Sequence, residues 1–140
     1  MYILVGYNKL KSEIKDSLES RDIDSYVIDD FESSKINSLL ESSKEKIDGM
    51  IFLFPEKEEI EGVLNYIDDN YFDIIATEHQ DKKIDGENID ILINENESVK
   101  NSILKEIEKI EFRKKSRELV DILSDEKSVS IFIHNNPDPD

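Results

Sequence analysis

Apolar residues follow two alternating patterns along most of this chain. Some stand in short unbroken runs, which are typical of strands that helices cover on both faces of a parallel sheet. Others recur every three or four positions among charged residues, as Leu10, Ile14 and Leu18 do, and this spacing predicts a helix with one buried face. The patterns predict strands at residues 2–5, 26–28, 49–54, 71–77 and 89–93, and helices within residues 10–18, 33–40, 56–69 and 98–123.

The alternation of strands and helices decides how the chain is wound. A helical connection returns the chain to a parallel neighbour by a right-handed crossover. We therefore predict an α/β fold with a doubly wound, five-stranded parallel sheet of order 3-2-1-4-5, with helices on both faces. The last helix is longer than one sheet face needs. Its second half is interpreted as a linker or a dimer seam, and its surplus of apolar residues predicts a homodimer.

The composition excludes several classes of protein. The chain has 140 residues, no cysteine and a formal net charge of -16 at pH 7. The missing thiols exclude a disulfide framework and cysteine-ligated metal sites, which fits a reducing cytoplasm. The negative charge opposes attachment of the whole surface to nucleic acid or anionic lipid. Because no apolar run approaches the roughly 20 residues of a membrane span, we expect a cytoplasmic protein without a membrane partner.

The turn after the first predicted strand is a candidate nucleotide site. The dinucleotide fingerprint G-x-G-x-x-G would begin at Gly6, but Asn8 and Lys11 stand at its second and third glycine positions. Their side chains take space that the pyrophosphate and the helix packing require, so tight NAD binding in the usual pose is not expected. The N–H groups at the start of the helix, with Lys9 beside them, still allow a looser anion site.

Two acidic residues end the second predicted strand. Asp29 and Asp30 stand where an acidic side chain would bind the ribose hydroxyls of a nucleotide. The alternative is a pair of acids that ends the strand and opens the next helix, and the acidic composition favours this alternative. The candidate cofactor-binding residues are therefore Gly6, Asn8, Lys9, Asp29 and Asp30.

Two further polar features are interpreted as parts of the surface. His79 has no companion at metal-ligand spacing and no neighbouring nucleophile, so a surface histidine is the simpler interpretation. The last helix holds a basic cluster that would either guide a polyanionic substrate or balance the acids near the carboxyl end of that helix. We favour the second role because no aromatic residue is interleaved for base stacking. The cluster consists of Arg113, Lys114, Lys115 and Arg117.

Residues 1–123 resemble the TrkA-N, or RCK, nucleotide-binding domain of potassium-transport regulators. The resemblance depends on ILVG at 3–6, Leu18, VIDD at 27–30, and the strand at 89–93 with a helix after it. It implies a Rossmann-like fold, frequent dimerisation and, in members with an intact glycine loop, binding of NAD or ATP. We therefore treat residues 1–123 as one domain, and residues 124–140 as a linker with the start of a second domain.

The last residues carry the most specific motif. An apolar strand is predicted at residues 128–133, and it delivers the sequence HNNPDPD at 134–140. This spacing places one imidazole and two carboxylates on a short loop whose prolines restrict the backbone. Such ligands suit manganese or a similar divalent ion, which activates water against a phosphorus centre. An acidic tail with prolines is the alternative interpretation. The candidate metal ligands are His134, Asp138 and Asp140.

The HNNPDPD sequence resembles the first motif of the DHH phosphoesterases, which include RecJ-type exonucleases, oligoribonucleases, exopolyphosphatases and family II pyrophosphatases. The resemblance implies that His134, Asp138 and Asp140 ligate manganese in a complete site. Further motifs of the family would lie beyond Asp140. We therefore expect this chain to be the amino-terminal part of a longer, exopolyphosphatase-related protein.

Three functions remain open at this point. The leading hypothesis is a regulatory or assembly domain of a DHH-type phosphoesterase, inactive alone, whose nucleic acid or polyphosphate substrate binds only to the DHH domain that follows. The second is a nucleotide-sensing module that binds NAD, AMP or a related anion near Gly6. The third, a small oxidoreductase, is the weakest, because the glycine loop is incomplete and no catalytic acid or base is convincing.

Overall fold

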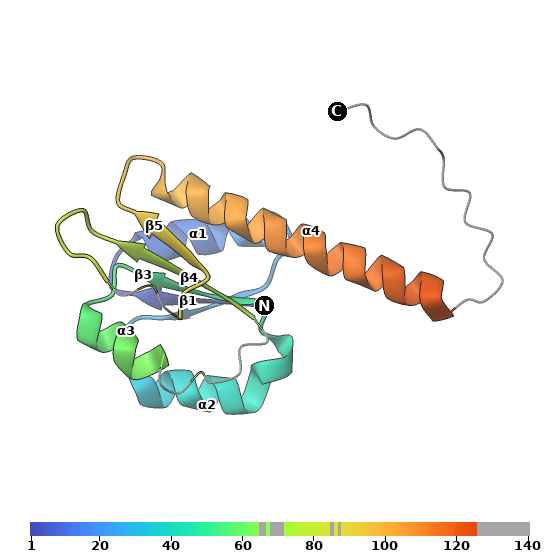
Figure 1. Cartoon of the computed structure of the whole chain (residues 1–140), viewed down its shortest axis with the longest axis horizontal. Coiled ribbons are helices and arrows are strands. Elements are labelled where there is room, and N and C mark those ends of the chain that lie inside the picture. The colour runs from blue at the N-terminus through green and yellow to red at the C-terminus, as the bar shows by residue number, and fades with distance from the viewer. Residues whose placement is uncertain (65–66, 68–71, 85, 87, 126–140) are drawn as a thin grey trace. The chain divides into compact units, whose positions relative to one another are not determined.

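The computed structural model describes residues 1–64, 67, 72–84, 86 and 88–125 of the chain. The chain divides into two compact units, Met1–Ile110 and Glu111–Asp140. The first unit contains a five-stranded sheet of β1 (Tyr2–Gly6), β2 (Ser25–Ile28), β3 (Gly49–Leu53), β4 (Asp73–Glu78) and β5 (Ile91–Asn94) (Figure 1). Its helices are α1 (Leu10–Glu19), α2 (Ser33–Ser43), the 3-10 turn η1 (Lys44–Lys46), α3 (Lys57–Leu64) and the first part of α4 (Val99–Asp125).

The sheet confirms the predicted α/β fold class but not the predicted strand order. Every pair of neighbouring strands is parallel, as a Rossmann-like fold requires. The order is β2-β1-β3-β4-β5, so the predicted order 3-2-1-4-5 is wrong. That prediction placed the third strand at an edge, whereas β3 lies between β1 and β4.

Burial explains why β3 occupies the centre. All residues of β1 and β3 are buried, as expected for strands that have a neighbour on each edge and helices on each face. In β2, by contrast, Tyr26 is 51 % exposed, which suits an edge strand. The unbroken apolar run of β3 therefore indicates a central strand. The order of the elements along the chain does not carry this information.

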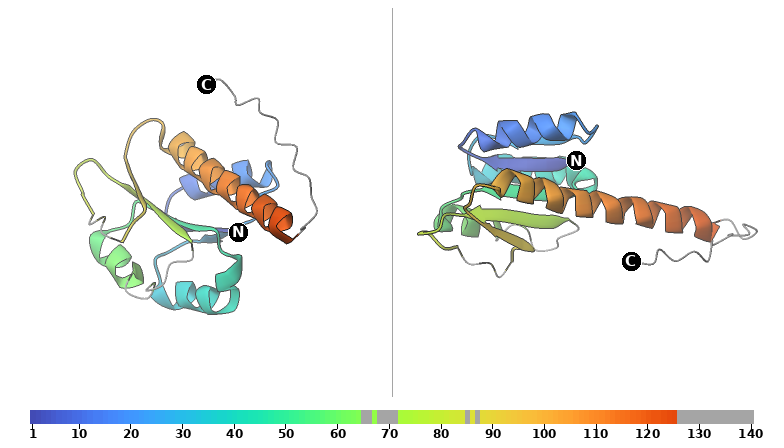
Figure 2. Two further views of the ribbon diagram at one scale, coloured as in Figure 1. Left: turned by 45° about the vertical axis from the view of Figure 1, so that its right-hand side comes forward. Right: turned by 90° about the horizontal axis from the view of Figure 1, so that it is seen from above.

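Helices cover both faces of the sheet, as Figure 2 shows. Successive side chains of a strand point to opposite faces. In β1, Ile3 and Val5 belong to the core that contains Ile36 of α2 and Ile60 of α3. Tyr2 and Leu4 belong to the second core, whose helical residues come from α1 and from α4 up to Ile110. The two cores hold the strands in register and fix the loops at their carboxyl ends.

The second unit is described only through residue 125, where α4 ends. Its part of α4 exposes large apolar side chains, among them Phe112 with 73 % of its surface accessible. The predicted strand at 128–133 lies outside the described residues, and so do His134, Asp138 and Asp140. Among the helices that the structure does describe, none has the length and apolar character needed to cross a membrane.

Candidate functional site

The strand order identifies the edge of the sheet where a ligand is expected. In an open parallel sheet, ligands bind beyond the carboxyl ends of the strands at the point where the winding reverses. For the order 2-1-3-4-5 this point lies between β1 and β3. The turn after β1 begins at Gly6, where an added Cβ would lie 2.9 Å from the Cβ and 3.0 Å from the O of Leu53. Packing between the two strands therefore explains this glycine without a ligand.

Lys11 links the turn after β1 to the end of β2. Its Nζ donates a hydrogen bond to the backbone O of Gly6 at 2.7 Å and lies 2.9 Å from Oδ1 of Asp29. The hydrogen bond and the positive charge of Lys11 hold the pKa of Asp29 below its ordinary value. The side chain at the third fingerprint position thus binds the carboxylate that was predicted to accept the ribose hydroxyls.

Tyr7 also links this turn to other elements of the fold. Its hydroxyl donates a hydrogen bond to Oε2 of Glu59 at 2.5 Å, and this bond raises the pKa of Tyr7. The ring also meets the ring of Phe31 edge-on, with the centroids 5.4 Å apart. Two side chains of the turn are therefore engaged with other elements of the fold.

Asp30 takes the second of its two predicted roles, in which it ends the strand and opens the next helix. Its Oδ1 accepts a hydrogen bond from the backbone N–H of Glu32 at 3.1 Å, and its Oδ2 lies 3.3 Å from Nζ of Lys35. Hydrogen bonds to Asp30 and Glu32 raise the pKa of Lys35. These contacts form the turn that leads into α2, so Asp30 opens the next helix.

A pocket of about 570 Å³ collects two of the predicted nucleotide residues. Asn8 and Lys9 line it together with Phe54 and with Asn96 and Lys100 near the start of α4. Lys9 is the amino-terminal cap residue of α1 and makes no side-chain capping bond there. The pocket lies beside the starts of two helices, whose backbone N–H groups and dipoles favour an anion. Two lysines line it, but so do three glutamates, whose negative charges oppose an anion.

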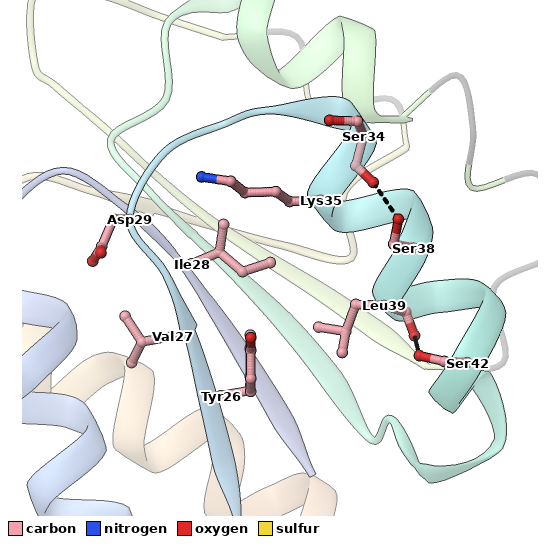
Figure 3. A pocket seen from close by; sticks show the side chains of 9 residues that line it. All are labelled: Tyr26, Val27, Ile28, Asp29, Ser34, Lys35, Ser38, Leu39 and Ser42. Carbon is pink, nitrogen blue, oxygen red and sulfur yellow. Dashed lines mark hydrogen bonds between the residues drawn. The ribbon is translucent and has the colours of Figure 1, made fainter.

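Asp29 lines a different pocket, of about 550 Å³, between the edge strand β2 and α2 (Figure 3). Tyr26 and Leu39 give this pocket apolar walls. Two serines of α2 that line it bond to their own helix, since Ser38 Oγ donates to the O of Ser34 and Ser42 Oγ donates to the O of Leu39. The structure thus does not bring the predicted cofactor-binding residues together in one pocket.

Sequence reasoning missed a cluster at the ends of β3 and β4. Phe54 has a φ of 52°, which is unusual for a residue with a side chain. Its backbone N–H donates to Oγ1 of Thr77 at 2.7 Å, and its ring stacks on the imidazole of His79 with the centroids 4.6 Å apart. The Nδ1 of His79 lies 3.1 Å from Oε2 of Glu95. A polar residue at the end of an apolar strand, Thr77, was the one available signal.

Glu78 was also missed, and it is the one acidic side chain in the core of the described residues. Its Oε2 accepts the backbone N–H of Ile84 at 3.1 Å, and its Oε1 lies 3.3 Å from Nζ of Lys83. Lys83 also donates to Oδ1 of Asn94 at 3.1 Å. These bonds hold the loop after β4, so the burial of Glu78 has a structural cause.

Metal-ligating side chains do not gather in the described part of the chain. Within those residues no group of three His, Cys, Asp or Glu side chains could hold a metal ion. Comparison with protein-family models, with curated proteins and with solved structures finds no match to this chain. The functional argument therefore depends on the carboxyl edge of the sheet and on the HNNPDPD sequence.

Proposed function

We propose that the first unit is a non-catalytic regulatory or assembly domain of a DHH-type phosphoesterase. The observation that carries this proposal is the position of Lys11, which binds both the Gly6 carbonyl and the Asp29 carboxylate. A nucleotide in the usual pose needs the room and the carboxylate that Lys11 takes. This arrangement supports a fold used as a scaffold.

The catalytic part of the proposal rests on the sequence HNNPDPD. An imidazole and two carboxylates are donors that suit manganese, so His134, Asp138 and Asp140 would hold the ion. When bound, such an ion lowers the pKa of water and stabilises charge at a phosphorus centre. The net charge of -16 would repel a nucleic acid or polyphosphate substrate, which fits binding confined to the metal-containing unit.

Hydrolysis by the complete gene product tests this proposal. With bis-p-nitrophenyl phosphate and Mn²⁺, we expect hydrolysis that Asp138→Asn reduces by more than the roughly 10–100-fold typical of losing a residue that only positions a metal ligand, because Asp138 would bind the ion directly. The matched control is Asp121→Asn, an exposed aspartate of α4 that should leave the rate unchanged. Absence of hydrolysis, or hydrolysis that survives Asp138→Asn, would refute the proposal.

Nucleotide sensing is the second candidate, and the 570 Å³ pocket favours it. A phosphate there would meet Lys9 and the starts of α1 and α4, away from the Lys11–Asp29 pair. A ligand that binds only the folded chain at about 100 times its Kd stabilises it by about 2.7 kcal/mol. Thermal unfolding with NAD, AMP, ATP or a cyclic dinucleotide therefore separates the candidates. A rise in Tm that Lys9→Ala abolishes and Lys15→Ala leaves intact would favour sensing.

Self-association is an alternative use of the apolar residues at the end of α4, and the regulatory role proposed here does not depend on it. The sequence predicts a homodimer from the surplus apolar residues of the last helix, and Phe112 and Leu119 in that helix are 73 % and 57 % exposed. The mass from light scattering at tens of micromolar would decide it, and a monomer at that concentration would count against an assembly role through a dimer.

A further inference from the structure

The second unit carries an apolar face of its own on α4. On a helix with about 100° per residue, Phe112, Leu119 and Leu123 fall within about 40° of one another, and Val120 and Ile122 flank them. Phe112 is 73 % exposed, Leu119 57 %, and Val120 and Ile122 59 % each. We call these five residues the 112–123 face.

The 112–123 face does not continue the repeat that covers the sheet. In the first unit, Ile103, Ile107 and Ile110 of α4 are buried in the core. The step from Ile110 to Phe112 is about 200° at about 100° per residue, so the apolar repeat changes phase by about half a turn. A helix that packs on one layer keeps the phase of its apolar repeat. The 112–123 face therefore requires a different packing partner.

We propose that residues 129–133 of the same chain cover the 112–123 face. In an extended strand, Val129, Ile131 and Ile133 would share one side, because every second side chain points the same way. Residues 126–128 separate this segment from the end of α4. Connections between a helix and a following strand are typically about 2–6 residues long, so three residues would be enough for a strand at 129–133 to fold back along α4.

The spacing of the two segments agrees with this packing. Two residues of a strand advance about 6.6 Å, and four residues of a helix advance about 6 Å. If Val129 lies beside Leu123, then Ile131 falls beside Leu119, four residues earlier in the helix. Two apolar positions of the strand therefore match the 112–123 face, and Ile133 would extend past it toward Lys115.

A second copy of the chain is the competing occupant, and two observations disfavour it. A coiled-coil seam needs apolar positions over at least about three heptads, whereas residues 111–125 contain about two. Lys115 and Ser116 stand at the positions between Phe112 and Leu119 that such a seam would fill. A segment attached by three residues also has an effective concentration of about millimolar, which exceeds that of a second copy in dilute solution.

This packing extends the proposed function. It rests on that proposal only in treating the HNNPDPD sequence as a metal motif. The strand would place His134 directly after a segment fixed on α4. Residues 111–125 would then be the first helix of the metal-containing unit, which agrees with the division of the chain between Ile110 and Glu111. Failure of this packing would leave the hydrolysis test untouched, because the two measurements are independent.

Paired cysteines test the contact, since the natural chain has none. In the 140-residue chain, Leu119→Cys with Ile131→Cys should form an intramolecular cross-link with a short bismaleimide. The matched control pairs Leu119→Cys with Phe132→Cys, which has almost the same separation in sequence but the opposite side of the strand. We expect a yield several-fold higher for the first pair, with the product running as a single chain.

A second measurement does not depend on the cross-linker. The thiol of Leu119→Cys should react several-fold faster with a small maleimide after Ile131→Asp, whereas Phe132→Asp should leave the rate nearly unchanged. Equal cross-linking of both pairs, or equal effects of both aspartates, would overturn the proposal. Products that are mainly dimeric would also overturn it and would assign the 112–123 face to a second copy.

Discussion

Replacing Gly6 by alanine tests directly whether close packing of β1 on β3 requires this glycine. Gly6 is the register partner of Leu53, and an added Cβ would lie 2.9 Å from Leu53 Cβ and 3.0 Å from Leu53 O. Real Cβ atoms essentially never approach so closely, and one of the two contacts is with backbone that is held in a central strand. No glycine of the described residues has a positive φ, so the cost arises from space and not from backbone conformation.

The expected magnitude follows from the packing. Forcing an extra methyl into a filled core typically costs about 1–3 kcal/mol. Gly62 provides a matched control, because a Cβ there would meet only Ser33 Oγ at 3.9 Å, within the helix α3. Alanine at such a helical position gains about 0.5–1 kcal/mol over glycine. At about 4 °C per kcal/mol, Gly6→Ala should lower Tm by roughly 4–12 °C, and Gly62→Ala should raise it by a few degrees.

Urea unfolding followed by circular dichroism measures both variants. Gly6→Ala should unfold at a lower urea concentration with an unchanged slope, because the surface exposed on unfolding stays the same. If Gly6→Ala unfolds at the urea concentration of the natural chain while Gly62→Ala shows its gain, the packing argument is refuted. The glycine would then have to be explained by the approach of a ligand.

Three further outcomes follow from the site. Thr77→Val should cost about 1–3 kcal/mol in urea unfolding, because the Phe54 N–H loses its acceptor at 2.7 Å; a variant as stable as the natural chain would contradict this. In Lys11→Met the pKa of Asp29 should rise toward its ordinary value of 3.8. A carboxyl whose pKa is lowered in the folded state contributes stability above pH 3.8, and this contribution is lost as the pH falls through the folded-state pKa. Lys11→Met should therefore lose less stability than the natural chain on acidification below about pH 4. An unchanged carboxyl titration of Asp29 by NMR would show that Lys11 is not the cause. Calorimetric titration of the 140-residue chain with Mn²⁺ should show no micromolar binding, since three ligands within one short segment must be ordered on binding; tight binding lost in Asp138→Ala would contradict this.

Local periodicity was sufficient to predict the elements of the first unit. The repeat of Leu10, Ile14 and Leu18 predicts α1, and the run at residues 2–5 predicts β1, because each pattern depends only on neighbouring residues. Strand order depends on contacts between segments far apart in sequence. The apolar run of β3 indicated burial on both faces, but the prediction took the first strand as the most central one and therefore placed β3 at an edge.

The candidate site was predicted less well, for a related reason. The sequence placed Asp29 and Asp30 correctly at the end of β2, but nothing local indicates that Lys11 reaches Asp29 across the turn. Phe54, Thr77 and His79 meet because β3 and β4 are neighbours, which was not the predicted arrangement. Contacts of this kind become visible only once the strand order is known.

The groups at the carboxyl edge also decide what kind of ligand the fold could accept. A nucleotide in the usual pose would have to displace Lys11 from Gly6 and from Asp29, and each hydrogen bond that it gained would replace one already made. Asp29 is 82 % exposed, so its ion pair with Lys11 costs little to break, and the main obstacle is the space that Lys11 takes beside the Gly6 carbonyl. An anion beside Lys9 and the start of α4 would not have to break either of these bonds. Any ligand affinity that the first unit retains is therefore expected there, on the side of β1 away from Asp29.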